Sequence, residues 1–259
     1  MRIVIEHQIV HRLPARMGAV AQMLRLTPAT SDDQTVANWR IDVDCDARMR
    51  PGQDGFGNAV TMLYVEEPVE VVTITASGDI LTSDAHGVVR GTSETLPPAL
   101  FLRATEATPA DAAIAAFARE AMAGTENRLA ALHALNVALH RRFAVDWKAA
   151  PTGQDAAHAF EAAAASPCDL AHILCVAARS LGIPARYVSG FATLESEARA
   201  HCWVEAHVDG LGWIGFDPCI GLSPQDRHVR VAIALDAGGA APVAGQPWSA
   251  GTAREAEEQ

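Results

Sequence analysis

Hydrophobic and polar residues alternate along much of the first hundred positions, with the period of two that favours β-strands. We predict four strands from this alternation or from a high content of β-branched residues: Met1–Val10, Trp39–Cys45, Val60–Val65 and Val69–Thr75. Turn-forming residues separate these segments, and Phe56-Gly57-Asn58 predicts a hairpin between two of them. The first part of the chain is therefore expected to be rich in β-structure.

The hydrophobic pattern changes after the proline-containing stretch Gly91–Pro109. The segments that follow are rich in Ala and Leu, and their apolar residues recur every three or four positions, as on one face of a helix. We predict helices over Asp111–Met122, Thr125–Arg142, Asp155–Ala165 and Asp169–Leu181. The change in pattern indicates a domain boundary near residue 105.

Strand patterns return after the last helix. The predicted strands are Ala185–Ala192, His201–Val208, Gly212–Phe216 and Val229–Ala234, and Asp209-Gly210 predicts a hairpin. Helices followed by an antiparallel sheet indicate an α+β fold rather than a doubly wound parallel one.

Three regions follow from these patterns. We expect a β-rich domain over residues 1–105, an α+β core over residues 106–236 and a flexible tail over residues 237–259, which is rich in Gly, Ala and charged residues.

Composition narrows the functional classes. The 259 residues include 31 acidic and 20 basic side chains, for a formal net charge of −11, so neither nucleic acid nor a membrane surface is expected as a partner. No apolar run is long enough to cross a membrane, and the first residues lack the features of a secretion signal. Five cysteines, an odd number, favour reduced thiols. We therefore expect a cytoplasmic protein, whose oligomeric state the sequence does not indicate.

Three polar residues stand where predicted elements begin or end: Cys168 before the last helix, His201 at the start of a strand and Asp217 at the end of another. A thiol at a helix N-terminus lies at the positive end of the helix dipole, which lowers its pKa. His201 and Asp217 are each about eight residues from the predicted hairpin turn and should be cross-strand neighbours. The three residues predict a Cys–His–Asp arrangement for nucleophilic catalysis.

Several blocks of the chain resemble bacterial transglutaminase-like proteins, which belong to the papain-like cysteine-enzyme superfamily. The blocks in the second half are Asp169–His172 (DLAH), Leu181–Gly190 (LGIPARYVSG), His201–Glu205 (HCWVE) and Gly212–Pro218 (GWIGFDP). Those resembling the β-rich N-terminal region of these proteins are Leu24–Pro28 (LRLTP), Gln34 and Asp54–Asn58 (DGFGN). The resemblance implies helices packed on an antiparallel sheet and cysteine-dependent acyl transfer or hydrolysis of a peptide or protein amide. It implies no cofactor.

The chain departs from the family at the nucleophile. The family pattern is Gly-x-Cys-x-Asp-x-Ala-His, whereas this chain reads Ala165-Ser166-Pro167-Cys168-Asp169-Leu170-Ala171-His172. Aligned on Asp169, the nucleophile position holds Pro167, and Cys168 lies one residue later. One residue on a helix turns a side chain by about 100°. The alternative function is therefore a catalytically inactive relative that binds a peptide or protein.

The sequence also offers candidate residues for binding the substrate and for stabilising an oxyanion. Trp203 and Trp147 are the candidate substrate-binding residues, and the oxyanion donors would be the Cys168 N–H and a group from residues 147–154. Cys175 is expected in the core, and Cys202 on the opposite strand face from His201.

Metal binding is the rival chemistry for the cysteines and histidines. Cys168 and His172 are four residues apart on one helix, with His201, Cys202 and His207 further along. The short paired spacings of structural zinc sites are missing from the sequence, so we predict no metal.

Overall fold

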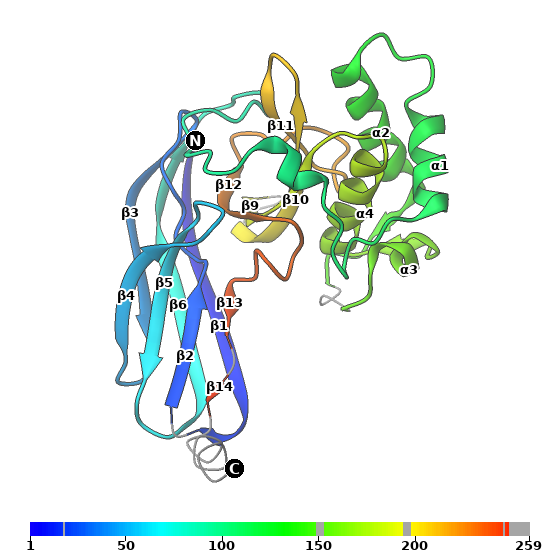
Figure 1. Ribbon diagram of the computed structural model, residues 1–259. Coiled ribbons are helices and arrows are strands. Elements are labelled where there is room, and N and C mark those ends of the chain that lie inside the picture. Colours follow the sequence, from blue (N-terminus) through cyan, green and yellow to red (C-terminus); the bar gives the residue numbers. More distant parts are fainter. Residues whose placement is uncertain (18, 149–152, 194–197, 246, 249–259) are drawn as a thin grey trace.

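The computed structural model describes residues 1–17, 19–148, 153–193, 198–245 and 247–248. A β-rich N-terminal region lies beside a core region in which helices pack against a sheet (Figure 1). This arrangement confirms the predicted α+β class. None of the described helices is long and apolar enough to cross a membrane.

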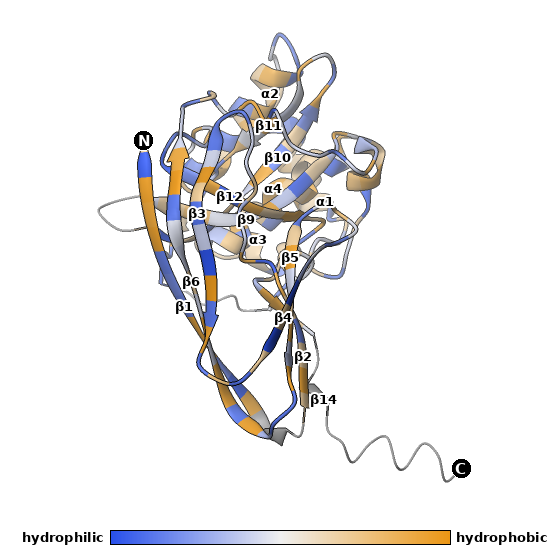
Figure 2. Cartoon of the chain, turned by 90° about the vertical axis from the view of Figure 1, so that its left-hand side faces the viewer, coloured by the Kyte–Doolittle hydropathy of each residue, from blue (hydrophilic) through white to orange (hydrophobic). Residues whose placement is uncertain are grey.

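The N-terminal region is a sandwich of two antiparallel sheets. Its strands are β1 (Arg2–Met17), β2 (Ala19–Leu24), β3 (Gln34–Val43), β4 (Arg48–Gln53), β5 (Ala59–Val65) and β6 (Val69–Thr82). One sheet has the order β1-β6-β3, and β2, β5 and β4 are neighbours in the other. Alternating hydrophobic residues (Figure 2) turn inward, so that Leu24, Leu63 and Ile74 are fully buried between the sheets.

The four strands predicted for this region are confirmed, but two others were missed. β2 alternates between buried and half-buried residues over only six positions, and every residue of β4 is exposed. β4 is held by backbone pairing with β5. Because none of its side chains is buried, its sequence shows no hydrophobic pattern. The predicted hairpin at Phe56-Gly57-Asn58 joins these two strands.

The core region begins with the short helix η1 and ends with an antiparallel sheet. Its helices are η1 (Pro98–Leu102), α1 (Ala112–Ala121), α2 (Arg128–Arg142), α3 (Ala156–Phe160) and α4 (Pro167–Ser180). Its strands are β7 (Ala144–Val145), β8 (Ala164–Ala165), β9 (Ala185–Thr193), β10 (Ala198–Val208), β11 (Gly212–Phe216) and β12 (His228–Ala234). The sheet order is β11-β10-β9-β12, and α4 packs against β9 and β10.

Two predicted helices have different limits in the structure. The helix expected over Asp155–Ala165 is shorter, because α3 ends at Phe160 and Ala164–Ala165 pairs with β7 as β8. α4 begins at Pro167 rather than Asp169, so Cys168 lies inside the first turn of the helix and not before it.

Side-chain amides from the N-terminal region complete the free edge of β12. Gln34 donates to the Arg230 carbonyl and accepts from its N–H, at 2.9 and 2.8 Å. Asn58 makes the same pair of bonds with Ile233, both at 2.8 Å. Each amide therefore replaces the peptide group of a missing neighbouring strand, which removes an exposed edge.

The segment after residue 236 was expected to be a flexible tail, and this is wrong for the described part of it. The strands β13 (Val243–Ala244) and β14 (Pro247–Trp248) both pair with β2. Ala240 is fully buried, and its carbonyl accepts a hydrogen bond from Ser189. Backbone pairing with a sheet edge needs no hydrophobic periodicity, which is why the sequence pattern did not reveal it.

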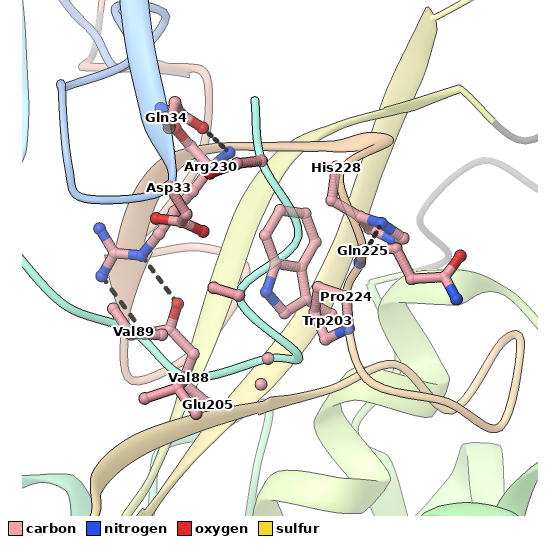
Figure 3. A pocket seen from close by; sticks show the side chains of 14 residues that line it. Asp33, Gln34, Val88, Val89, Trp203, Glu205, Pro224, Gln225, His228 and Arg230 are labelled. Carbon is pink, nitrogen blue, oxygen red and sulfur yellow. Dashed lines mark hydrogen bonds and ion pairs between the residues drawn. The ribbon is translucent and has the colours of Figure 1, made fainter. Parts of the chain in front are cut away.

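A buried ion cluster ties three elements of the core together. Glu205 on β10 is bonded by Arg186 from β9 and Arg230 from β12, each at 2.7 Å, and Arg186 also binds Glu94 (Figure 3 shows the Glu205–Arg230 pair). Burial alone would raise the pKa of Glu205, but the two guanidinium groups lower it to about 2. Glu205 therefore stays ionised in the folded protein.

Replacing Glu205 with Gln should destabilise the protein by about 3–5 kcal/mol, because the buried Arg186 and the partly buried Arg230 lose their shared anion. Because the pKa of Glu205 falls from 4.5 to about 2 on folding, its stabilisation is complete above pH 4.5 and is lost as the pH falls toward 2. Denaturant unfolding at several pH values measures both effects. The control is Glu66→Gln in the exposed Arg48–Glu66 pair, which should change stability by less than about 1 kcal/mol. Equal effects of the two substitutions would contradict the prediction.

Candidate functional site

The start of α4 is fixed by a reciprocal capping interaction. The Ser166 hydroxyl accepts from the Asp169 N–H at 3.2 Å, and the Asp169 carboxylate accepts from the Ser166 N–H at 3.1 Å. Pro167 is the first helical residue, a position that proline suits because its missing N–H has no partner there. These contacts make Cys168 the second residue of the helix.

The Cys168 thiol lies against Tyr187 and Cys202. Its sulfur is 3.1 Å from the Tyr187 hydroxyl and 3.4 Å from the Cys202 sulfur. The hydrogen bond with Cys202 lowers the pKa of Cys168 most; burial opposes this, and Tyr187 and, more weakly, His201 lower it further. The resulting pKa is about 7, so much of Cys168 is thiolate near neutral pH.

A second group of residues is centred on the Asp217 carboxylate, which is fully buried after β11. One of its oxygens lies 2.7 Å from Nε2 of His201 and 3.1 Å from Nε2 of His228, and the other accepts from the Cys219 N–H at 2.9 Å. Although burial alone would raise the pKa of Asp217, the imidazole of His201 and hydrogen bonds from both histidines hold it well below its ordinary value. Asp217 is therefore an anion that orients two imidazole rings.

The hydrogen bonds assign the tautomers of both rings. His228 Nδ1 accepts from the Gln225 N–H at 3.1 Å (Figure 3), so its Nε2 carries the proton that bonds Asp217. His201 likewise presents Nε2–H to Asp217. The other ring nitrogen of neutral His201, Nδ1, is then the one that can accept a proton.

His201 and Asp217 meet as the hairpin argument predicted, although they are not directly opposite. β10 and β11 pair from Val208–Gly212 to Val204–Phe216. Continuing this register by one residue places Asp217 opposite Trp203, so His201 is the diagonal neighbour on the same face.

Cys168 and His201 lie near each other without a hydrogen bond between them. His201 and Cys202 are consecutive on β10 and point to opposite faces, as predicted, and the Cys168 sulfur contacts the Cys202 side. His201 lowers the pKa of Cys168 less than the hydrogen bonds from Cys202 and Tyr187 do. Both residues nevertheless line one cavity of about 650 Å³.

The walls of this cavity come from parts of the chain that are far apart in sequence. His7, Arg25 and Leu26 belong to the N-terminal region, whereas Ala237 and Pro242 belong to the segment expected to be a tail. The cavity is therefore not a property of residues 106–236 alone.

The two tryptophans expected to bind substrate lie in different places. Trp147 is 46% exposed, lines the cavity and has its ring 5.8 Å from that of His201. Trp203 is buried, with its ring 5.4 Å from that of His228, and is not among the residues that line the cavity. Of the expected oxyanion segment, residues 149–152 lie outside the described residues, and Gln154 lines the cavity.

The structure also places the remaining candidates. Cys175 is fully buried in α4, and burial raises its pKa to about 11, which fits the expected core role. His172 also lines the cavity, and its Nε2 accepts the N–H of Ala237 at 3.0 Å.

Of the residues in the rival metal hypothesis, His201 and Cys202 point to opposite faces of β10, and a different trio comes together. The ligand atoms of His201, Asp217 and His228 lie within 4.8 Å of one another. Their short contacts are satisfied by N–H groups donated to Asp217, and His228 Nδ1 is already an acceptor. These donor atoms are therefore arranged for a hydrogen-bonded cluster. Sequence reasoning missed His228, because a histidine just ahead of a predicted strand carries no distinguishing signal.

Comparison with known proteins finds a family match for each of two regions of the chain. Residues 115–218 match the family model of the transglutaminase-like superfamily, and residues 3–80 match that of the bacterial transglutaminase-like N-terminal region. An uncharacterized protein of Mycobacterium leprae is 27% identical over 266 aligned residues, covering 95% of this chain and 92% of that one.

A solved structure shows a similar fold. A crystal structure named a "Putative Cysteine Protease" from Cytophaga hutchinsonii aligns with a TM-score of 0.76 at 19% identity, over 94% of this chain and 85% of that one. The periplasmic domain of TgpA from Pseudomonas aeruginosa aligns over 86% of this chain and 90% of that one at 17% identity, with a TM-score of 0.40. The two matched family regions together cover more than half of the chain, and the protein belongs to the transglutaminase-like superfamily, with a bacterial transglutaminase-like N-terminal region.

Proposed function

We propose that the protein catalyses cysteine-dependent acyl transfer from, or hydrolysis of, an amide in a peptide or protein. The observation that carries this proposal is that a thiol with a lowered pKa, Cys168, and an imidazole oriented by Asp217, His201, line the same cavity. A nucleophile, a proton carrier and a residue that orients it are the groups that thioester chemistry requires.

The proposed reaction has two halves. Nδ1 of neutral His201 takes up the proton of the Cys168 thiol as the sulfur attacks the amide carbonyl. The C–N bond then breaks as this proton passes from Nδ1 to the leaving amine. Water or an amine then attacks the thioester, giving its proton to Nδ1 and restoring the thiolate. Because Cys168 and His201 are not bonded to each other, the substrate carbonyl is expected to lie between them.

The first turn of α4 supports the charge that develops on the substrate oxygen. The N–H groups of a helical first turn have no partner within the helix, so the Cys168 N–H is a suitable oxyanion donor. A second donor from residues 147–154 stays part of the proposal. The cavity volume of about 650 Å³ suits a side chain with its flanking peptide segment.

A second candidate is a binding module without chemistry, and one observation favours it. Pro167 occupies the position that the family pattern gives to the nucleophile, and the Cys168 sulfur contacts Cys202 rather than His201. In this case the cavity binds a peptide, and Cys168 is reactive without turning over a substrate.

The pH dependence of alkylation tests whether Cys168 is an activated thiol. Because its pKa is lowered to about 7, its reaction with iodoacetamide should rise about tenfold per pH unit below 7 and level off above pH 8. Cys45 is an internal control, because burial and the neighbouring Asp44 and Asp46 raise its pKa, so its rate should still be rising at pH 9. Peptide mapping by mass spectrometry measures both. Parallel profiles for the two cysteines would refute the activated thiol.

A burst assay with p-nitrophenyl acetate tests turnover. We expect one equivalent of nitrophenol to be released rapidly, followed by slow turnover, because Cys168 acylates faster than the thioester is hydrolysed. Cys168→Ser should abolish the burst, and His201→Ala should slow turnover by a factor of about 10²–10⁴. His86→Ala, which changes an exposed histidine, and Cys45→Ser are the controls.

The same assay separates the two candidate functions. A burst at Cys168 with turnover that His201→Ala leaves unchanged would favour the binding module. An equal burst in wild type and Cys168→Ser would reject Cys168 as the nucleophile.

A further inference from the structure

A second cysteine lies directly against the candidate nucleophile. The sulfur atoms of Cys168 and Cys202 are 3.4 Å apart. Among the described residues, no other two cysteine sulfurs are within hydrogen-bond distance of each other. One belongs to the first turn of α4 and the other to β10, and these two elements pack against each other. The proposed acyl-transfer chemistry needs only one of these thiols.

The two thiols differ in a way that divides their roles. Both thiols line the cavity, but Cys168 is half-buried, whereas Cys202 is only 4% exposed. Burial, and the hydrogen bond with Cys168, raise the pKa of Cys202 well above its ordinary value, whereas that of Cys168 is lowered to about 7. A small oxidant entering the cavity therefore meets a reactive thiolate first, with a protonated thiol beside it.

We propose that Cys168 and Cys202 form a peroxide-sensitive dithiol site, in which Cys168 is oxidised first and Cys202 then closes a reversible disulfide. The inference rests on the geometry of the two sulfurs and stands whether or not the protein carries out acyl transfer.

The chemistry balances with hydrogen peroxide as the oxidant. The Cys168 thiolate attacks one peroxide oxygen, so an S–O bond forms, the O–O bond breaks and the departing hydroxide takes up a proton as water. The Cys202 sulfur then attacks the sulfenic acid; an S–S bond forms, the S–O bond breaks, and the thiol proton leaves with the hydroxyl as a second water. Two thiols are oxidised and one peroxide is reduced to two waters.

The move that closes the disulfide is small. The sulfurs must approach from 3.4 Å to the bond length of about 2.05 Å, by rotation of the Cys168 side chain and a slight shift of the first turn of α4. Cys175 is buried within α4, Cys219 is held by its N–H bond to Asp217, and Cys45 lies in the N-terminal region. No cysteine other than Cys202 has its sulfur recorded in contact with Cys168 in the described part of the chain.

Closure of the disulfide would also affect the proposed reaction. The bond consumes the thiolate and draws its sulfur to the Cys202 face of β10, away from His201. Under the proposed function, peroxide therefore abolishes the burst, and a small dithiol reductant restores it.

The test scores the thiols themselves, so it does not depend on activity. The full-length protein is treated with hydrogen peroxide, its remaining thiols are blocked by alkylation, and the peptides are mapped without and with reduction. We expect the free-thiol count to fall by two, a linked pair of peptides holding Cys168 and Cys202, and full recovery with dithiothreitol. Cys45→Ser should form the same link at an unchanged rate.

Single variants identify the order of events. In Cys202→Ser, peroxide should drive Cys168 to sulfinic and sulfonic acid, which dithiothreitol does not reverse. In Cys168→Ser, oxidation of Cys202 should slow at least about tenfold, because a buried thiol of raised pKa has little thiolate. Conversion of wild-type Cys168 to sulfinic acid without a linked peptide, or a link from Cys168 to Cys219, would overturn the proposal. A missing link together with a normal burst would reject the dithiol and leave the proposed function standing.

Discussion

The start of α4 decides what the site can do. The reciprocal bonds between Ser166 and Asp169 fix the helical register, and Pro167 fills the first position without losing a hydrogen bond. In that register the only cysteine of the first turn is the second residue, and its sulfur contacts β9 and β10 through Tyr187 and Cys202. A shift of one residue along the helix thus changes the partners of the sulfur, while the helix, the sheet and the cavity stay in place.

The anion of Asp217 plays the corresponding part on the other side of the cavity. It accepts hydrogen bonds from His201, His228 and the Cys219 N–H, which uses its acceptor capacity with well-defined donors. Both rings bond the same oxygen of Asp217, and His228 is held in turn by the Gln225 N–H. Rotation of one ring would therefore change the hydrogen bond that the other ring makes with this oxygen. The orientation of His201 therefore depends on His228, which lies outside the predicted Cys–His–Asp arrangement.

Much of this architecture could be predicted from the sequence, and the errors have physical causes. Long alternating strands and leucine-rich helices can be recognised in the sequence, because burial of one face gives them a periodic hydrophobic pattern. The sequence of β4 carries no such pattern because all its residues are exposed, and β13 is only two residues long, too short to show one. The positions of Cys168, His201 and Asp217 at the ends of predicted elements singled out these three residues, but the contact between Cys168 and Cys202 depends on how α4 rotates against β10. No pattern within either segment specifies that rotation, and His228 likewise joins the cluster through its place in the sheet.

The mixed origin of the cavity wall has a consequence for how this protein can be taken apart. Gln34 and Asn58 bond the free backbone groups of β12 at the edge of the core sheet. The segment after residue 236 lines the cavity before β13 pairs with β2. An excised core would present a bare strand edge, and its cavity would lack the walls that the N-terminal region and the segment after residue 236 supply. A domain that replaced the sandwich at the beginning of the chain would therefore have to supply two side-chain amides for β12 and the same part of the cavity wall.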